Sequence, residues 1–171
     1  MTPDEFARKA ELQFSDSSLL QRALTHRSYL NENPEFLEDN ERLEFLGDAT
    51  LDFLAAEWLY NRFPELDEGH MTRMRSALVR TEQLAEFARE IKLGETLFLG
   101  KGEDSSGGRD RPALLCATFE ALIGALYLDS GLDAVADFIE PRFERAAEVA
   151  MEGEMLFDPR SVLQMWAQSE I

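Results

Sequence analysis

Four carboxylates recur at helical spacing in one stretch of the chain: Glu41, Glu44, Asp48 and Asp52. Residues three or four positions apart share one face of an α-helix, so these side chains lie together if the stretch is helical. Like charges at this spacing repel, and large apolar residues fill the positions between them. A carboxylate row that approaches an apolar core requires a cation, and hard oxygen ligands suit Mg²⁺ or Mn²⁺. A solvated acidic stripe on an amphipathic helix is the alternative that spacing alone leaves open.

The element expected to carry this row is a helix over about residues 37–63. At 1.5 Å per residue it would be on the order of 40 Å long, enough to cross a small domain. Pro34 discourages an earlier start. Two shorter helices are expected before it, over about 2–11 and about 16–25, from their apolar spacing and candidate N-caps.

Helical character resumes over about 67–91, where Thr81 is a candidate cap that divides the run into two helices. An almost wholly apolar helix is expected over about 112–128, and Gly131 separates it from a further helix over about 132–151. No sustained alternation of apolar and polar residues predicts a strand. The expected fold class is therefore all-α.

Residues 99–111 connect two of these helical runs. They contain four glycines, two serines and mixed charge, with no apolar residue after Leu99. This composition predicts a mobile surface loop.

Composition describes one globular domain: 171 residues, 44% apolar and 30% charged. The single cysteine, Cys116, excludes an internal disulfide and fits a reducing compartment, and its apolar neighbours predict a buried thiol. No apolar run approaches the length of a membrane span, and the first residues lack the features of a signal peptide. We therefore expect a cytoplasmic protein with no membrane partner.

The net charge of −17 argues against general affinity for nucleic acid, because phosphate binding depends mainly on Lys and Arg. A nuclease whose carboxylates are bridged to phosphate by metal ions remains compatible with this charge. In that case another domain would supply the broader basic surface.

The order of residues in the acidic stretch, Asn40-Glu41-Arg42-Leu43-Glu44-Phe45-Leu46-Gly47-Asp48, resembles the signature of the ribonuclease III family, which cleaves double-stranded RNA. Further blocks resemble the same family in the same order, over roughly residues 5–150. They are Leu24-Thr25-His26-Arg27-Ser28-Tyr29, Arg62-Phe63-Pro64, Asp67-Glu68-Gly69, Thr72-Arg73-Met74-Arg75 and the run from Phe119 to Asp129. The resemblance implies an all-α, homodimeric endonuclease domain of the ribonuclease III type.

The resemblance also assigns expected site residues. Glu44, Asp48 and Glu120 match the family's metal ligands, for Mg²⁺ with Mn²⁺ as the alternative cation, and Glu41 and Glu68 match acidic residues near the cleavage site. Glu41, Asp48, Glu68 and Glu120 are therefore the expected catalytic residues. The implied reaction leaves 5′-phosphate and 3′-hydroxyl ends, as in the processing of ribosomal and other RNAs.

Ala117 departs from the family pattern. The family generally has an aspartate three residues before the glutamate that corresponds to Glu120, and on a helix the two share a face. Loss of one carboxylate weakens metal binding, since the ligands set both charge and geometry. Three explanations are open: an introduced inactivating change, a natural change compensated by water or Asp52, or a naturally inactive relative.

Phe45 lies between the acidic positions of the signature. In family members the matching aromatic residue inserts into a pocket of the partner subunit, which implies a dimer interface here. A symmetric dimer explains the cleavage of two strands, because each site cuts one.

The tail suggests a domain boundary. We expect a nuclease domain over residues 1–152, followed over 153–171 by a linker and the start of a truncated double-stranded-RNA-binding domain, because Gly153 and Asp158-Pro159 are typical of a connector. A terminal helix packed on the core is the alternative.

The sequence thus predicts an endoribonuclease that cleaves double-stranded RNA with a divalent metal. The competing hypothesis is a catalytically impaired RNA-binding or dimeric assembly module, which Ala117 favours.

Overall fold

The computed structural model describes residues 1–157 and is built from helices. In chain order they are α1 (Pro3–Lys9), α2 (Ser17–Ala23), α3 (Arg27–Leu30), α4 (Glu41–Arg62), α5 (Glu68–Leu78), α6 (Thr81–Glu90), the 3₁₀ helix η1 (Leu93–Thr96), α7 (Lys101–Ser105), the 3₁₀ helix η2 (Gly108–Asp110) and α8 (Pro112–Phe157). The described part contains no β-strand, only an isolated bridge between Thr25 and Phe98. The predicted all-α class is confirmed.

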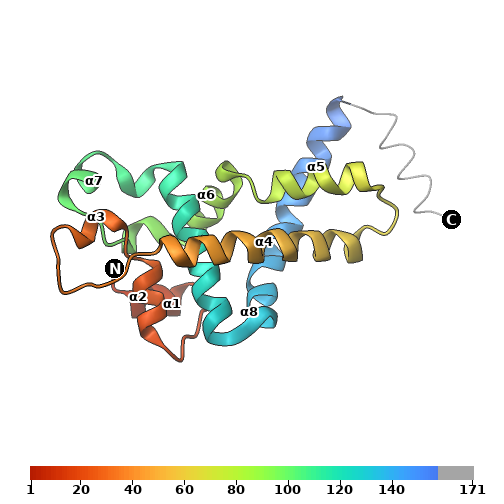
Figure 1. The fold of residues 1–171 in the computed structure, drawn as a ribbon. Coiled ribbons are helices and arrows are strands. Elements are labelled where there is room, and N and C mark those ends of the chain that lie inside the picture. The colour runs from red at the N-terminus through yellow and green to blue at the C-terminus, as the bar shows by residue number, and fades with distance from the viewer. Residues whose placement is uncertain (158–171) are drawn as a thin grey trace.

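Helix α4 lies across the middle of the molecule, and α8 reverses direction so that both of its halves pass beside it (Figure 1). The reversal occurs at Gly131, whose φ of 84° and ψ of −177° are not helical, as the sequence predicted. A positive φ of this kind favours glycine, which has no Cβ to clash. Pro141 lies inside the second half of α8.

Buried aromatic and aliphatic side chains from α1, α4, α6 and α8 form the main core. The largest fully buried ones include Phe6, Phe87, Phe119 and Phe143. One window of α8, within Pro112–Met151, is long and apolar enough by composition to cross a membrane, a feature that inspection of the sequence missed. Of this window 61% is buried within the domain, as in a core helix.

Local signals explain where several helices begin. Thr2 accepts from the Glu5 amide while the Glu5 side chain accepts from the Thr2 amide, which is a capping box at the start of α1. Asp16 caps α2 in a similar way. A break before Thr81 divides the 67–91 run into α5 and α6, as predicted. Thr81 does not cap the second helix as expected, because it is the first residue of α6 and no side chain caps this helix.

The predicted start of the long helix was four residues too early, since α4 begins at Glu41 rather than near residue 37. Asn40 precedes it and is 3% exposed. Its backbone N–H donates to Thr25 O at 3.0 Å, and its side-chain Nδ2 donates to Ala23 O at 3.3 Å. These contacts with the α2–α3 connection hold the chain outside the helix up to Asn40.

The prediction of a mobile surface loop over 99–111 was wrong in secondary structure, because α7 and η2 occupy this segment. The Arg109 guanidinium donates to both carboxylate oxygens of Asp104, and to the carbonyls of Gly94 and Leu97 at 3.0 Å each. After the buried Leu99, the segment is therefore held by ionic and polar contacts.

Helix α8 continues through Gly153 to Phe157, so the backbone is helical where the linker was expected to start. The rest of the proposed connector and truncated domain lies outside the described residues. The division into two domains stays a prediction.

Candidate active site

The site is built where α4 crosses the first half of α8. A Cβ at Gly47 would lie 1.7 Å from the backbone oxygen of Glu120, and a Cβ at Gly124 would lie 2.2 Å from the oxygen of Leu43. Only glycine at these positions allows the two backbones to approach so closely. The crossing brings Glu120 of α8 to the acidic face of α4.

Three carboxylates gather near this crossing: Glu44, Asp48 and Glu120. Burial raises the pKa of Glu120 to about 7, and the negative charges of Asp48 and Glu44 add to the effect, while a hydrogen bond from Cys116 opposes it. Burial also raises the pKa of Glu44, and the charges of Glu41 and Asp48 contribute. The cluster is therefore short of positive charge. Helical spacing accounts for Glu44 and Asp48, whereas Glu120 was expected only from the family resemblance.

Cys116 is a contact of the site that the sequence did not indicate. Its Sγ lies 3.5 Å from Oε1 of Glu120. Burial, followed by the charge of Glu120, raises the pKa of the thiol to about 12, so the thiol stays protonated and donates to the carboxylate. A spacing of four residues on α8 is the only sequence signal for this contact.

Ala117 lies one helical turn before Glu120 and offers no oxygen to the cluster. Among the described residues, no group of three or more His, Cys, Asp and Glu side chains is arranged to hold a metal ion. The donors present nevertheless fit a hard divalent cation in ligand type and charge, because they are carboxylates and the charges of Asp48 and Glu44 on α4 raise the pKa of Glu120 on α8. The residues thus match a divalent cation in the type and charge of their donor atoms, with one oxygen donor fewer than the family pattern.

Glu41 and Glu68 are the two remaining predicted residues of the site. Glu41 is exposed at the first turn of α4, and its Oε1 accepts from Nη1 of Arg27 at 3.3 Å. Glu68 is the first residue of α5, and it is not among the charges that act on Glu44 or Glu120. Of the two residues, Glu41 is therefore the one whose charge acts on the cluster, since it contributes to the raised pKa of Glu44.

Phe45 points away from the core and is 81% exposed. Phe53 and Tyr60 on the same helix are 51% and 70% exposed, and their spacing places all three within one broad face of α4. Exposed aromatic residues gathered in this way are typical of a protein–protein contact.

Both the sequence and the fold are similar to those of known proteins. The family model described as "Ribonuclease-III-like" matches residues 16–146. Ribonuclease 3 of Roseiflexus sp. (strain RS-1) is 49% identical over 170 residues, which is 98% of this chain and 72% of that protein. Ribonuclease 3 1 of Nostoc sp. is 52% identical over 162 residues, covering 94% of this chain and 71% of that protein.

Solved structures agree with these matches. The nuclease domain of ribonuclease III from Campylobacter jejuni superposes with a TM-score of 0.76 at 33% identity, covering 84% of this chain and 96% of that one. A Dicer from Pichia stipitis superposes with a TM-score of 0.59 at 31% identity, covering 81% of this chain and 59% of that one.

Together, the helical fold and the acidic crossing define a nuclease domain. The chain belongs to the ribonuclease III family. The resemblance predicted from the sequence is thereby confirmed, and the chain spans 72% and 71% of the length of the two relatives named above.

Proposed function

We propose that this domain is an endoribonuclease that hydrolyses phosphodiester bonds of double-stranded RNA with the help of Mg²⁺, leaving 5′-phosphate and 3′-hydroxyl ends. The observation that carries the proposal is the group of carboxylates from α4 and α8 at one backbone crossing, with the pKa of Glu44 and Glu120 raised. Family membership supports the reaction class.

Glu44, Asp48 and Glu120 are the residues that would hold the cation. When bound, a divalent cation lowers the pKa of a water molecule and stabilises the leaving oxygen of the phosphodiester. Glu120 must lose its proton to act as a ligand, so its pKa of about 7 makes metal binding compete with protonation near neutral pH. Glu41 lies beside the cluster, where it can orient a water or a substrate group.

We propose that the domain acts as a homodimer formed through the exposed face of α4 that contains Phe45, Phe53 and Tyr60. The exposure of these aromatic side chains supports the proposal. The nuclease domain from Campylobacter jejuni is described as flexible in a region involved in dimer formation, which supports a dimer for that relative. Two sites in one dimer would each cut one strand of a duplex.

The second candidate is an RNA-binding or assembly module of the same fold with impaired catalysis. Ala117 favours it, together with the finding that no three potential ligands in the described part form a ready cation site. Both candidates predict a folded dimer, and they differ only in metal binding and cleavage.

The experiment compares cleavage of a long RNA duplex by the chain and by its Ala117→Asp variant, with Mg²⁺ and at low salt. Ala113→Asp is the matched control, because it adds the same charge one turn earlier on α8 at an exposed position. We expect Ala117→Asp to tighten Mg²⁺ binding by about tenfold or more in calorimetry and to raise the cleavage rate.

If the chain and its Ala117→Asp variant both cleave the duplex, and Ala113→Asp cleaves it at the rate of the chain, the enzymatic proposal is supported. The site would then tolerate alanine at position 117. Cleavage by Ala117→Asp alone would identify Ala117 as an inactivating residue on a nuclease scaffold. Absence of cleavage by either, with the dimer intact in sedimentation, would overturn the enzymatic proposal in favour of the assembly module.

A further inference from the structure

His26 precedes α3 and caps it with its imidazole ring. The backbone N–H of Ser28 donates to Nδ1 of His26 at 3.2 Å. A backbone N–H can only donate, so Nδ1 has no proton and acts as an acceptor. Oγ of Ser28 lies 2.8 Å from the same nitrogen, and its hydroxyl therefore also donates to Nδ1.

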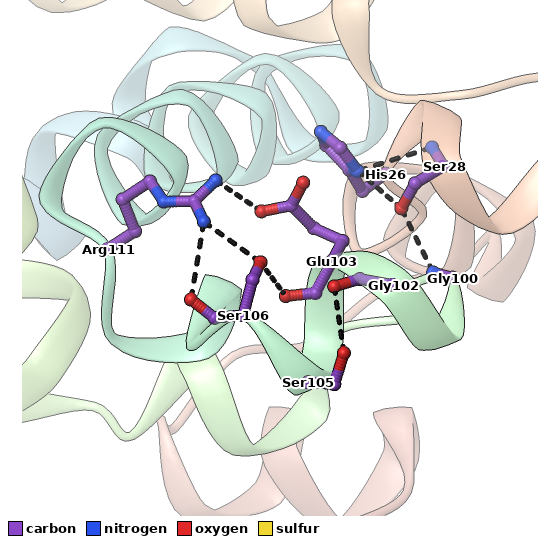
Figure 2. Close-up of polar contacts among 8 residues, drawn as sticks. All are labelled: His26, Ser28, Gly100, Gly102, Glu103, Ser105, Ser106 and Arg111. Carbon is purple, nitrogen blue, oxygen red and sulfur yellow. Dashed lines mark hydrogen bonds and ion pairs between the residues drawn. The ribbon is translucent and has the colours of Figure 1, made fainter.

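The Ser28 hydroxyl in turn receives a hydrogen bond from the chain just before α7. The N–H of Gly100 donates to Oγ of Ser28 at 2.9 Å, which completes a path from Gly100 through Ser28 to His26 (Figure 2). The N–H of Lys101 donates to Oε1 of Glu32 at 2.9 Å. A Cβ at Gly100 would lie 2.6 Å from Ser28 O, so the two segments are in tight contact.

Further contacts continue from α7 to the start of α8. The carboxylate of Glu103 accepts from the guanidinium of Arg111, whose Nη2 also donates to Oγ of Ser106 at 3.1 Å (Figure 2). Arg111 directly precedes α8, the helix that carries Glu120. On the other side of the junction, Asn40 joins the first turn of α4 to the backbone beside His26.

The junction of His26, Ser28 and Gly100 therefore lies between the starts of the two helices whose carboxylates form the candidate active site. We propose that His26 and Ser28 are positioning residues: unprotonated Nδ1 orients Ser28 and, through its hydroxyl, holds Gly100 and α7 in place. Protonation of Nδ1 removes the acceptor that the Ser28 N–H and hydroxyl both use, which displaces Ser28 and loosens its contact with Gly100. The hydrogen-bond geometry stands independently of the function, whereas the effect on cleavage rests on the function proposed above.

Burial and the charged groups around His26 together determine the pH at which the junction opens. Burial lowers the pKa of His26 from its ordinary value of 6.5, and Arg27 of α3 acts in the same direction. Glu103 of α7, Asp39 before α4 and Glu41 of α4 oppose this effect. Burial prevails, so the junction is intact at neutral pH and opens as the pH falls below 6.5.

The direct test follows the Gly100 amide and the His26 ring by NMR between pH 7.5 and 5 in the full chain. The chain has two histidines, so the His70→Asn variant leaves one imidazole signal, that of His26. We expect an Nε2–H tautomer at neutral pH and a titration midpoint below 6.5. The Gly100 amide shift should follow the same midpoint.

Two pairs of variants separate positioning from folding. Asparagine accepts from a backbone N–H but does not titrate, so His26→Asn should preserve the α3 cap and abolish the pH dependence at Gly100. Ser28→Ala should speed hydrogen exchange of the Gly100 amide by about fivefold, which is the effect expected from the loss of one hydrogen bond. Ser28→Thr should restore the protection of this amide. An Nδ1–H tautomer, or a Gly100 amide that ignores the His26 titration, would overturn the proposal.

Cleavage adds a second readout, measured in the Ala117→Asp background if the parent chain does not cut. The ratio of the His26→Asn rate to the parent rate cancels the titration of Glu120, which both proteins share. This ratio should rise by about tenfold for each pH unit below the pKa of His26. A constant ratio with the NMR result intact would restrict the junction to a structural contact and overturn its positioning role, whereas loss of cleavage in every variant would contradict the proposed function alone.

Discussion

Glu120 is the residue where burial, charge and the proposed chemistry meet. Its carboxyl group is held beside Glu44 and Asp48 by the helix crossing, and it accepts a hydrogen bond from a thiol that stays protonated. A carboxyl group with a pKa of about 7 exists in both forms near neutral pH. Deprotonation at Glu120 is thus a condition that any metal-bound form of the site must satisfy.

The raised pKa of Glu120 also makes the free energy of unfolding depend on pH. The pKa of its carboxyl group is about 7 in the folded chain against an ordinary 4.5, so its favourable contribution is complete below 4.5 and is lost as the pH rises through 7. We expect Glu120→Gln to remove on the order of 1 kcal/mol of the difference in unfolding free energy between pH 5 and pH 8, after allowance for solvent screening.

Thermal and denaturant unfolding in EDTA over this pH range measure the effect. Glu57→Gln, which alters an exposed carboxylate on α4, is the control. Parallel stability curves for Glu120→Gln and the parent would contradict the prediction.

At the scale of elements, the domain depends on the contact between α4 and α8. Their glycines meet at the crossing, and farther along the second half of α8 packs beside the end of α4, where Arg62 and Glu144 form an ion pair with Nη2 and Oε1 2.8 Å apart. The same contact that forms the core therefore also sets the separation of the carboxylates.

Gly47→Ala should disrupt this crossing, because the new methyl group would overlap the Glu120 carbonyl. We expect a loss of about 3 kcal/mol in the free energy of unfolding, together with weaker metal binding. Gly102→Ala is the matched control, since no atom lies within 4 Å of its Cβ position, and it should be neutral or slightly stabilising. Equal urea midpoints for the two variants would show that the crossing tolerates a side chain.

A second prediction at this scale concerns Arg109, whose guanidinium joins η2 to Asp104 and to two backbone carbonyls. Lysine cannot reproduce the forked geometry, so Arg109→Lys should cost about 1–3 kcal/mol and increase hydrogen exchange in α7. Arg145→Lys tests an exposed pair with Glu90 and should cost less than about 1 kcal/mol. Similar losses in the two variants would argue against an ordering function for Arg109.

At the scale of the whole molecule, a net charge of −17 coexists with an apolar aromatic face on α4. Charge of one sign keeps monomers apart, so association requires a localised apolar contact. The exposed aromatic side chains of α4 provide one.

Phe45→Ala should weaken the proposed dimer by about 2 kcal/mol or more, the loss typical of an aromatic anchor at an interface. Sedimentation velocity at micromolar concentration measures the shift from dimer to monomer. Val149→Ala removes another exposed apolar side chain, on α8, and should leave the sedimentation coefficient unchanged. A parent chain that is already monomeric at this concentration would contradict the proposed dimer.

Much of the fold was predictable because its signals are local. The helix within residues 16–25 follows from a cap and apolar spacing, and the break at Gly131 follows from glycine; these signals act over a few positions. The division before Thr81 was also predicted, although no side chain caps α6. The shared face of Glu41, Glu44 and Asp48 follows from helical periodicity alone. The absence of a carboxylate at Ala117 is likewise a property of the sequence compared with its family pattern.

Other features depended on contacts between segments far apart in the chain. The helical structure of residues 99–111 depends on contacts made by Arg109 and Arg111. Composition does not specify which carboxylates and carbonyls their guanidinium groups reach. The start of α4 at Glu41 depends on Asn40 binding the backbone near Thr25. The sequence by itself determined most of the longer helices, the acidic row and the missing aspartate, since these require only local periodicity and residue identity. Only the tertiary structure decided the raised pKa of Glu120 and the His26 junction, because burial and hydrogen-bond partners exist only once distant helices have packed.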